Sequence, residues 1–433
     1  MTFPRLSDSA LVRRHAVDGV HELVVHDARS GALYVLTPEQ WALVRRADGM
    51  RTLDEIAAAD GGGVPVAAIA ALFNDLTRAG LLEEGPRIVV EPGRPRTTLG
   101  DLRHRTLVAL ADFAFTCDGA GECCSGYSSL SVTRDDLASA RACEGGLADV
   151  DANEAASPTP LTGAEQRDHF ALPLVDGRCF ALNERARCTL HERGGPEAKP
   201  RSCRTYPTTL LDDGDIIRVS VTCECSCVFR SRAKSGEGAQ DRWLADLPSE
   251  TPIHTLADLV PITVHAHATR EAVARWSRSI LELRTCDDGV ELLLNEARRL
   301  RERAEPGAPH EPDELTRAVE ALANLTERGA IAARAWRSAK DPSRISREAC
   351  AAAAGRAASP GRVDALRRVT DGVEDELLFA RAMIYGCAWG APLADGLVRA
   401  AARLMVSREL RAAGVSEGHP IALIERVARS LEG

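Results

Sequence analysis

The sequence lacks several features that mark common classes of protein. Its 433 residues include no apolar run of about 18 residues, so we expect no transmembrane helix and no membrane partner. The first residues, MTFPRLSDSALVRRH, show no apolar core with a cleavage site, so we expect no secretory signal and a cytoplasmic location. Lysine occurs only at Lys199, Lys234 and Lys340, and the net charge of −9 argues against a nucleic-acid partner.

Three chemical motifs are also missing. No C-x2-C pair occurs, which disfavours a plain zinc finger or zinc ribbon. No glycine-rich GxGxG loop follows a strand, which argues against a Rossmann-like methyltransferase. GECCSGY lacks the strand–turn–helix frame of a nucleophile elbow, and no paired His and Asp suggest a hydrolase. Any catalysis would therefore use an unfamiliar site, and no catalytic residue is assigned.

The length exceeds what one hydrophobic core usually serves, so two or three domains are expected. Strand and helix patterns change along the chain and predict an α+β protein in three parts. These parts are a small module at 1–85, a cysteine-rich region at 106–232 with short β-hairpins, and an all-helical region at 255–433. Residues 86–105, rich in proline, glycine and arginine, are expected to form a linker.

The first part predicts a β-hairpin followed by three helices. HELVVHD and ALYVLT alternate like strands around ARSG. The helices are expected to start at Thr37 with Pro38 in the first turn, at Thr52, and in VPVAAIAALFNDLTRAG, which ends at Gly80.

This order, with LVRRHAVDG before it and LTRAGLLEE after it, resembles the PqqD-like domain, a winged-helix-like module. The resemblance implies that the module recognises a leader peptide by adding its strand to the hairpin edge. The alternative is a small domain that only packs on its neighbour.

Thirteen cysteines are the most informative residues that the chain does contain. Disulfides are the less favoured explanation, because the chain is long, has an odd cysteine count and is expected in the cytoplasm. Metal binding is favoured by the nine that crowd into one quarter of the chain: Cys117, Cys123, Cys124, Cys179, Cys188, Cys203, Cys223, Cys225 and Cys227. The scattered Cys143, Cys286, Cys350 and Cys387 are expected to be buried apolar residues.

The first group of thiols lies in FTCDGAGECCSGY, where glycines allow the tight folding that a metal-binding loop requires. In the second group, RCFAL and RCTLH flank a polar turn like two strands and would bring Cys179 near Cys188. TTLLDDGDIIRVSVTCECSC predicts a further hairpin with DDGD at its turn. If its second strand continues through C-x-C-x-C, three sulfurs lie on one face while Glu224 and Ser226 face away.

Thiolates are soft ligands and select zinc or an iron–sulfur cluster, such as a 4Fe-4S cluster, over magnesium or calcium. A single site takes about four protein ligands, so nine cysteines predict either two sites or one site with additional redox-active or spectator thiols. His191 is an alternative ligand or an ordinary surface or core histidine. An iron with an open position could bind a substrate or S-adenosylmethionine, whereas a fully ligated metal would transfer electrons or stabilise the fold.

The glycine-rich cysteine pair, the later C…C…H series and KPRSCRTYP resemble the YkgJ-type cysteine-cluster proteins, a zinc- or iron-chelating family. Within that group the sequence is most similar to the flagellin lysine-N-methylases, the FliB-like proteins. The family pattern is C-x2-C-x2-C-C, and Ala120 stands at its second cysteine. The resemblance implies ligands at six positions (Cys117, Cys123, Cys124, Cys179, Cys188 and Cys203), with the Cys223–Cys227 run able to supply the missing one.

The sequence is compatible with three functions. The resemblance implies a metal-dependent modifier of a protein or peptide, by analogy a lysine N-methylase. The second is a non-catalytic protein that stores, delivers or senses metal, or whose metal only holds the fold together. The third is a leader-peptide-binding component of a peptide-maturation pathway. The helical part, interrupted by EPGAPHEP at 305–312, shows no catalytic motif.

Overall fold

The computed structural model describes most of the chain, and the structural statements that follow concern these residues. They are 4–7, 10–17, 20–27, 33–47, 49, 51–59, 64–84, 97–117, 121–126, 131–142, 159–160, 169–171, 174–175, 178–232, 238–282, 288–307, 313–336, 341–386, 392–415 and 418–432. The predicted turn ARSG, most of the predicted linker, and three scattered cysteines (Cys143, Cys286 and Cys387) lie outside them.

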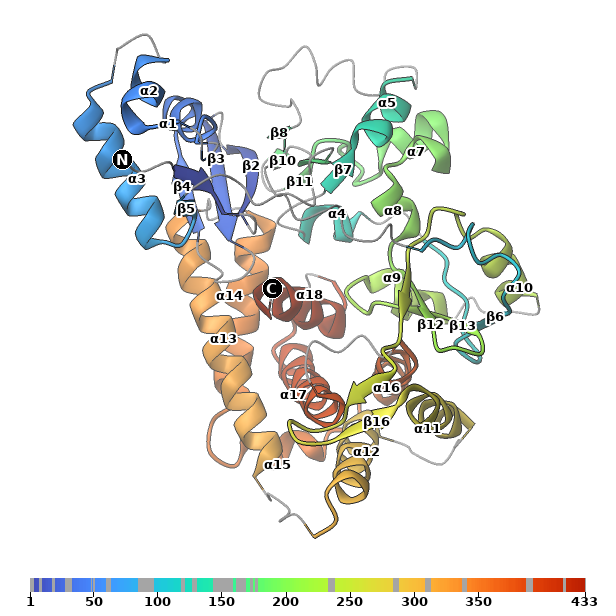
Figure 1. The fold of residues 1–433 in the computed structure, drawn as a ribbon. Helices are drawn as coiled ribbons and strands as arrows, with labels where there is room; N and C mark the ends of the chain where they lie inside the picture. The colour runs from blue at the N-terminus through green and yellow to red at the C-terminus, as the bar shows by residue number, and fades with distance from the viewer. Residues whose placement is uncertain are drawn as a thin grey trace.

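The first part of the chain forms a small antiparallel sheet backed by three helices (Figure 1). Its elements are β2 (Ala10–Val17), β3 (Val20–Asp27), β4 (Leu33–Leu36), α1 (Pro38–Val44), α2 (Leu53–Ala58) and α3 (Val66–Arg78). β1 (Pro4–Leu6) pairs with β5 (Leu82–Glu84) and closes the module. The pairing of the two predicted strands is confirmed, whereas the relation to winged-helix and PqqD-like domains stays a prediction.

The predicted helix starts are confirmed at the level of individual hydrogen bonds. The Thr37 Oγ1 accepts the Gln40 amide at 3.2 Å, and the Gln40 side chain accepts the Thr37 amide at 2.9 Å. Thr52 and Glu55 make the same reciprocal pair. Such capping boxes satisfy two amides that the first helical turn leaves without partners. Local chemistry is therefore enough to start these two helices.

The small sheet extends beyond the first part of the chain. β10 (Leu174–Val175) pairs in parallel with β2, and β11 (Arg178–Cys179) pairs with β10, which makes the strand order β11-β10-β2-β3-β4. Both β10 and β11 belong to the cysteine-rich region. The first module and the strand that carries Cys179 therefore share one hydrogen-bonded sheet.

A second sheet combines strands from the middle of the sequence. Its order is β14 (Ile253–Thr255), β12 (Thr208–Asp212), β13 (Ile217–Val221) and β6 (Leu107–Ala109). The antiparallel pairing of β12 with β13 confirms the predicted DDGD hairpin. All five residues of β13 are buried, which agrees with a central strand.

The expectation of a linker at 86–105 is wrong for its last nine residues, 97–105. Leu99 is buried, and its amide donates to the Thr251 carbonyl at 2.9 Å. Thr98 forms an antiparallel β-bridge with Pro252. Burial of the leucine and these backbone bonds anchor the segment against the 249–252 turn. The proline- and arginine-rich composition does not reveal this.

The rest of the chain is mostly helical. Its long helices are α11 (Arg270–Glu282), α12 (Gly289–Ala304), α13 (Glu314–Trp336), α14 (Pro342–Ala357), α16 (Val373–Gly386), α17 (Leu393–Ala412) and α18 (Pro420–Glu432). α17 is buried along most of its length, with other helices around it (Figure 1). The predicted break at 305–312 is confirmed, because α12 ends at Ala304 and α13 begins at Glu314.

The expectation of an all-helical third part is wrong at its beginning. β15 (Leu259–Pro261) and β16 (His267–Thr269) form an antiparallel pair before α11. These strands are only three residues long, and a segment of that length carries too little alternation to be recognised in the sequence. Among the described residues, no helix is long and apolar enough to cross a membrane.

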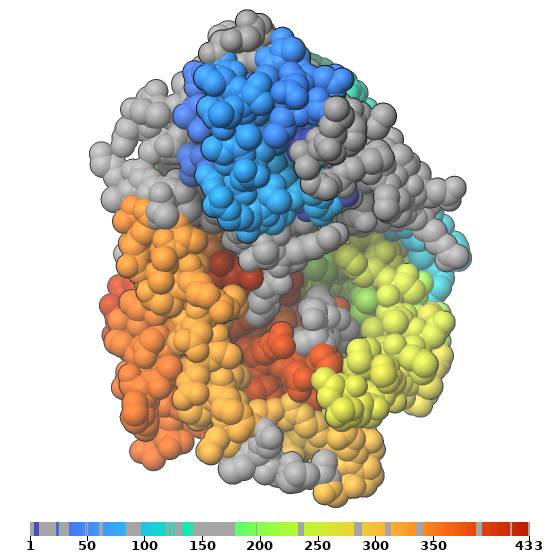
Figure 2. All heavy atoms as spheres, turned by 60° about the vertical axis from the view of Figure 1, so that its left-hand side comes forward, coloured from blue at the N-terminus to red at the C-terminus, as the bar shows by residue number. Residues whose placement is uncertain are grey.

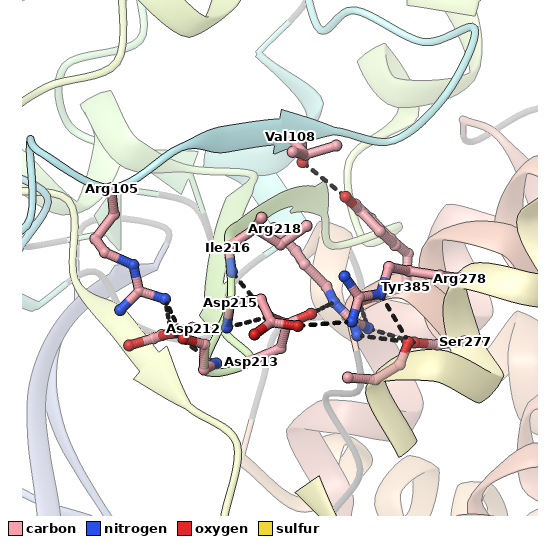
Figure 3. A network of polar contacts seen from close by, with 12 residues as sticks. Arg105, Val108, Asp212, Asp213, Asp215, Ile216, Arg218, Ser277, Arg278 and Tyr385 are labelled. Atoms are coloured by element: carbon pink, nitrogen blue, oxygen red, sulfur yellow. Dashed lines mark hydrogen bonds and ion pairs between the residues drawn. The ribbon is translucent and has the colours of Figure 1, made fainter. Parts of the chain in front are cut away.

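A buried arginine joins the second sheet, of strand order β14-β12-β13-β6, to the helices (Figure 3). Arg218 on β13 has a fully buried side chain, and its Nε donates to Asp213 Oδ2 at 2.7 Å. Its Nη1 donates to Ser277 Oγ on α11 at 2.5 Å and to the Tyr385 carbonyl on α16 at 3.4 Å. One guanidinium thus connects three elements, and its charge is matched by one buried carboxylate.

The Asp213–Arg218 pair makes the free energy of unfolding depend on pH in the acidic range. Burial by itself would raise the pKa of Asp213, but hydrogen bonds from the Ile216 amide and from Arg218 outweigh it and lower the pKa on balance. A lowered folded-state pKa contributes stability that is present above the ordinary value of about 3.9 and is lost as the pH falls through the folded-state pKa. We expect Asp213→Asn to flatten the loss of stability below about pH 4, measured by urea unfolding from pH 6 to pH 2.

The matched control is Asp215→Asn, because Asp215 lies two residues away with an exposed side chain that pairs with Arg278. Surface pairs contribute little, so this variant should keep the acid dependence of the parent. Equal pH slopes in the parent and in Asp213→Asn would contradict the role assigned to Asp213.

Candidate metal centre

The glycine-rich cysteine loop is positioned by close backbone contact with a second cysteine segment. Gly121 has a φ of +69°, and a Cβ atom there would lie 2.2 Å from the Ala186 carbonyl oxygen. Only glycine permits both the backbone angle and this approach. The contact places α4 (Glu122–Gly126), which carries Cys123 and Cys124, against the turn between Cys179 and Cys188.

Three predicted ligands share one small buried cluster. Cys179 is buried, and Cys124 and Cys188 are half-buried against the same apolar side chains, including Leu182 and Leu190. Leu182 and Cys188 form an antiparallel bridge, which agrees with the expected approach of the two segments. RCTLH is nevertheless not a strand, because α7 (Thr189–Gly194) begins directly after Cys188.

Cys203 lies on α8 (Arg201–Thr205), a short helix that one buried carboxylate holds in place. Asp136 Oδ1 accepts the Arg201 amide at 2.7 Å, while Oδ2 accepts the amide and hydroxyl of Thr133 at 2.9 and 2.8 Å. Burial alone would raise the pKa of Asp136, yet these hydrogen bonds lower it on balance. The carboxylate therefore stays charged and fixes the start of the helix that carries Cys203.

Loss of that carboxylate should loosen Cys203. We expect Asp136→Ala to lower the free energy of unfolding by about 1–3 kcal/mol, because the buried Arg201 amide loses its acceptor. Cys203 should also be alkylated faster, which can be followed by mass spectrometry after timed iodoacetamide treatment. Asp135→Ala is the control, since Asp135 is the exposed neighbour of Asp136 on α5 (Arg134–Ala142). Equal alkylation rates in the two variants would contradict the positioning role.

The expected strand through C-x-C-x-C is wrong. β13 ends at Val221, Cys223 lies in a turn, and Cys227 lies on α9 (Ser226–Arg232). The strand stops because Val221 pairs with Thr208, the first residue of β12, and the residue before it, Pro207, accepts the Thr222 amide at 2.8 Å but has no amide of its own to continue the ladder. The three sulfurs therefore do not line one strand face, and Ser226 is buried rather than facing solvent.

All three of these cysteines are buried in the main hydrophobic core. Burial, together with Glu425 and Glu224, raises the pKa of the Cys223 thiol far above its ordinary value, and Arg429 opposes this only in part. A thiolate at Cys223 would therefore need a metal ion in direct contact. Of the three cysteines in this run, Cys223 most resembles an ordinary core residue.

Contacts from distant parts of the chain connect the two cysteine groups. Arg230 on α9 donates from Nη1 to Glu122 Oε1 at 2.9 Å and from Nη2 to Cys227 Sγ at 3.5 Å. Arg426 on α18 donates to the Glu122 carbonyl at 2.9 Å. Because Glu122 directly precedes Cys123, these bonds link α4 to Cys227. Cys117 itself is exposed, and its neighbour Thr116 bonds to Ser231 on α9.

His419, at the start of α18, lies beside the cysteine run. Its amide donates to Ser226 Oγ at 3.1 Å, its ring stacks on Phe229 with centroids 3.8 Å apart, and its Nε2 lies 3.1 Å from Asp375. Nothing in the sequence around His419 indicates this position, since it is nearly 200 residues from Ser226. By contrast, the predicted alternative ligand His191 is exposed on α7.

The donor set fits zinc or iron in its chemistry. Soft thiols are concentrated here, and two buried polar atoms, Glu122 Oε2 and His419 Nδ1, have no hydrogen-bond partner among the described residues. Within those same residues, however, no three His, Cys, Asp or Glu side chains are arranged to hold one metal ion. The side chain of Cys123 lies outside the described set. The structure thus brings Cys124, Cys179 and Cys188 into one cluster without assembling a complete coordination shell.

Comparison with known proteins agrees with this chemistry. A family model named CxxCxxCC, described as "Putative zinc- or iron-chelating domain", matches residues 116–224, about a quarter of the chain. The match supports the cysteine-cluster resemblance and metal binding, while the FliB-like and PqqD-like resemblances stay predictions. No curated protein and no solved structure matches the chain.

Proposed function

We propose that this protein binds zinc or iron through its cysteine cluster and acts in the modification of a protein or peptide substrate. The observation that carries the metal part is the contact of Gly121 with Ala186, which packs α4 against the 182–188 turn and gathers Cys124, Cys179 and Cys188. Core packing alone does not require such a glycine. The matching zinc- or iron-chelating model supports the same conclusion.

The remaining predicted ligands complete the proposal. Cys123 lies on α4 next to Cys124, and Cys203 lies on α8, whose Arg201 amide bonds to Asp136. Cys117 follows Thr116, which bonds to Ser231 on α9, and Arg230 links Cys227 on the same helix to Glu122 on α4. Cys225 directly precedes α9. A bound zinc with four thiolates would be structural, whereas a zinc or an iron–sulfur cluster with an open position would supply a Lewis-acid or redox centre. Arg230 donates a hydrogen bond to the Cys227 sulfur at 3.5 Å.

Metal content is the direct test. Protein purified without oxygen should contain either about four irons with labile sulfide and a broad visible absorption band, or one or two zinc ions per chain without colour. Iron and sulfide would direct further work to redox chemistry and to S-adenosylmethionine. Zinc would direct it to a structural or metal-handling role. Protein with neither metal would overturn the proposal.

The substrate part of the proposal draws on the first module. Among the described strands, β4 ends its sheet, and the proposal is that a peptide strand adds to its outer edge, as in other domains that recognise peptides by strand addition. By resemblance, the modification would be lysine N-methylation. Incubation with labelled S-adenosylmethionine and lysine-containing peptides tests it, and neither transfer nor donor binding would contradict methylation. Chelation that unfolds the protein without affecting any reaction would favour the scaffold alternative.

A further inference from the structure

A cavity of about 450 Å³ lies between α13 and α17, and none of the predicted metal ligands lines it. Figure 2 shows this face of the molecule hollowed, with α13 in light orange on one side, α17 in orange-red at the floor and the yellow β15–β16 region opposite. Cavities of 300–1,000 Å³ are typical of ligand sites. The chain therefore has a second hollow that the cysteine chemistry does not explain.

The lining follows one face of each helix. From α13 come Arg317, Ala321, Leu325 and Arg328, spaced by three or four residues, which places them on the same side. From α17 come Asp395, Val398, Arg399 and Ala402, at positions i, i+3, i+4 and i+7 of one helix face. The groove thus has an apolar floor, and arginines stand along both walls.

The charge of this groove is positive. Both acidic residues in the lining, Glu314 and Asp395, are held by Arg301, whose Nη2 lies 2.7 Å from Asp395. Arg328 and Arg399 are exposed, and neither makes a hydrogen bond or ion pair with the described part of the chain. Exposed arginines on a partly apolar groove attract anionic ligands and steer their approach.

Exposed apolar side chains lie around the same groove. Ile331 is 55% exposed, one turn beyond Arg328 on α13. Val264 and Leu259, 70% and 61% exposed, lie in the β15–β16 hairpin. The Ala394 amide donates to the Ile262 carbonyl at 3.0 Å and so holds this hairpin against the first turn of α17. Large exposed apolar side chains gathered at one groove mark interaction sites.

We propose that the α13–α17 groove binds an acidic amphipathic segment of a protein partner, with its carboxylates on the arginines and its apolar face on the floor. From Arg317 to Ile331 α13 runs about 21 Å, which matches a helical segment of about four turns docked in a groove. The inference rests on the proposed function in one respect. The partner would be the protein or peptide that is modified, or a protein that delivers it. The binding itself needs no metal chemistry.

The test uses the full chain as purified and three fluorescein-labelled 15-residue amphipathic peptides that share one leucine pattern. Their polar positions are glutamate, glutamine or lysine. Fluorescence anisotropy should show micromolar binding of the glutamate peptide alone, weakened by salt because the contacts are exposed ion pairs. The Arg328→Glu and Arg399→Glu double variant should weaken this binding at least tenfold.

Arg103→Glu with Arg275→Glu is the matched control, because both arginines are exposed and neither lines the cavity. This control should bind the glutamate peptide like the parent. Equal binding of the glutamate and glutamine peptides, or a loss of binding in the control as well, would overturn the proposal. Binding of inorganic phosphate or ATP that depends on Arg328 and Arg399, without peptide binding, would overturn it in favour of a small anion. Metal content, measured in parallel, reports separately on the proposed function.

Discussion

Replacing both Cys124 and Cys179 with serine is expected to remove most of the bound zinc or iron and to unfold the segment between Thr116 and Arg232. The two thiols lie in one apolar cluster, on α4 and on β11. A serine hydroxyl remains protonated at neutral pH and is a poor ligand for these metals. Because a structural zinc contributes about 10–16 kcal/mol of apparent binding free energy in small domains, its loss would leave this region without its main stabilisation.

Metal analysis and hydrogen exchange, measured on the same samples, check this prediction. Exchange should accelerate in the cysteine-rich region and remain slow in the buried helix α17. Cys350→Ser is the control, since Cys350 is fully buried on α14 and is not among the predicted ligands. That variant should lose some stability but keep its metal. Unchanged metal content in the Cys124 and Cys179 double variant would contradict the assignment of these residues as ligands.

Arg408→Ala is expected to destabilise the helical part by about 3–5 kcal/mol, because removal of one member of a buried ion pair leaves the other charge poorly compensated. Only Arg411, 3.7 Å away, would still face Glu376. The side chains of Arg408 and Glu376 are both fully buried, with the Arg408 Nη2 at 2.6 Å from Glu376 Oε2. The same nitrogen lies 2.9 Å from Asp288 Oδ2, and Nη1 donates to the Leu366 carbonyl at 2.9 Å. One arginine therefore joins α17 to α16, to α15 (Arg362–Arg367) and to the start of α12.

Urea unfolding followed by tryptophan fluorescence measures the effect. Arg356→Ala is the matched control, because Arg356 is half-exposed and Arg362 also holds its partner Glu409. Its loss should cost less than about 1 kcal/mol. The Arg408→Met and Glu376→Met double variant should recover much of the stability, since no buried charge remains without a partner. A cost for Arg408→Ala no larger than that for Arg356→Ala would be inconsistent with a central role for the pair.

Features that depend on a few neighbouring residues were predictable. Thr37 and Thr52 begin helices because a hydroxyl and a side chain three residues later satisfy the first amides. The DDGD turn joins two alternating apolar segments that pair as a hairpin. Gly121 adopts the positive φ that a tight cysteine loop needs. In the first two cases the decisive interaction spans fewer than about ten residues, and the φ of Gly121 is equally local. The contact of Gly121 with Ala186 is not local and was not predictable.

The C-x-C-x-C run shows where local reasoning fails. Its alternation is compatible with a strand, but a strand needs a partner, and β12 begins at Thr208, directly after Pro207, which has no amide to continue the ladder. The chain therefore turns and continues as α9, which buries Cys227 against the helices. The sequence does not indicate how far a neighbouring strand extends.

Cysteine number, spacing and glycine content are local properties, and they were enough to indicate a soft-metal cluster. They did not indicate the short helices α4, α7, α8 and α9 that carry or adjoin its cysteines. The surroundings of that cluster depend on tertiary structure alone. Glu122, Arg230, His419 and Arg426 meet because α18 folds back onto α4 and α9 across up to about 300 residues, driven by burial of apolar surface that no short motif encodes. The same long-range packing of α13 on α17 creates the arginine-lined groove.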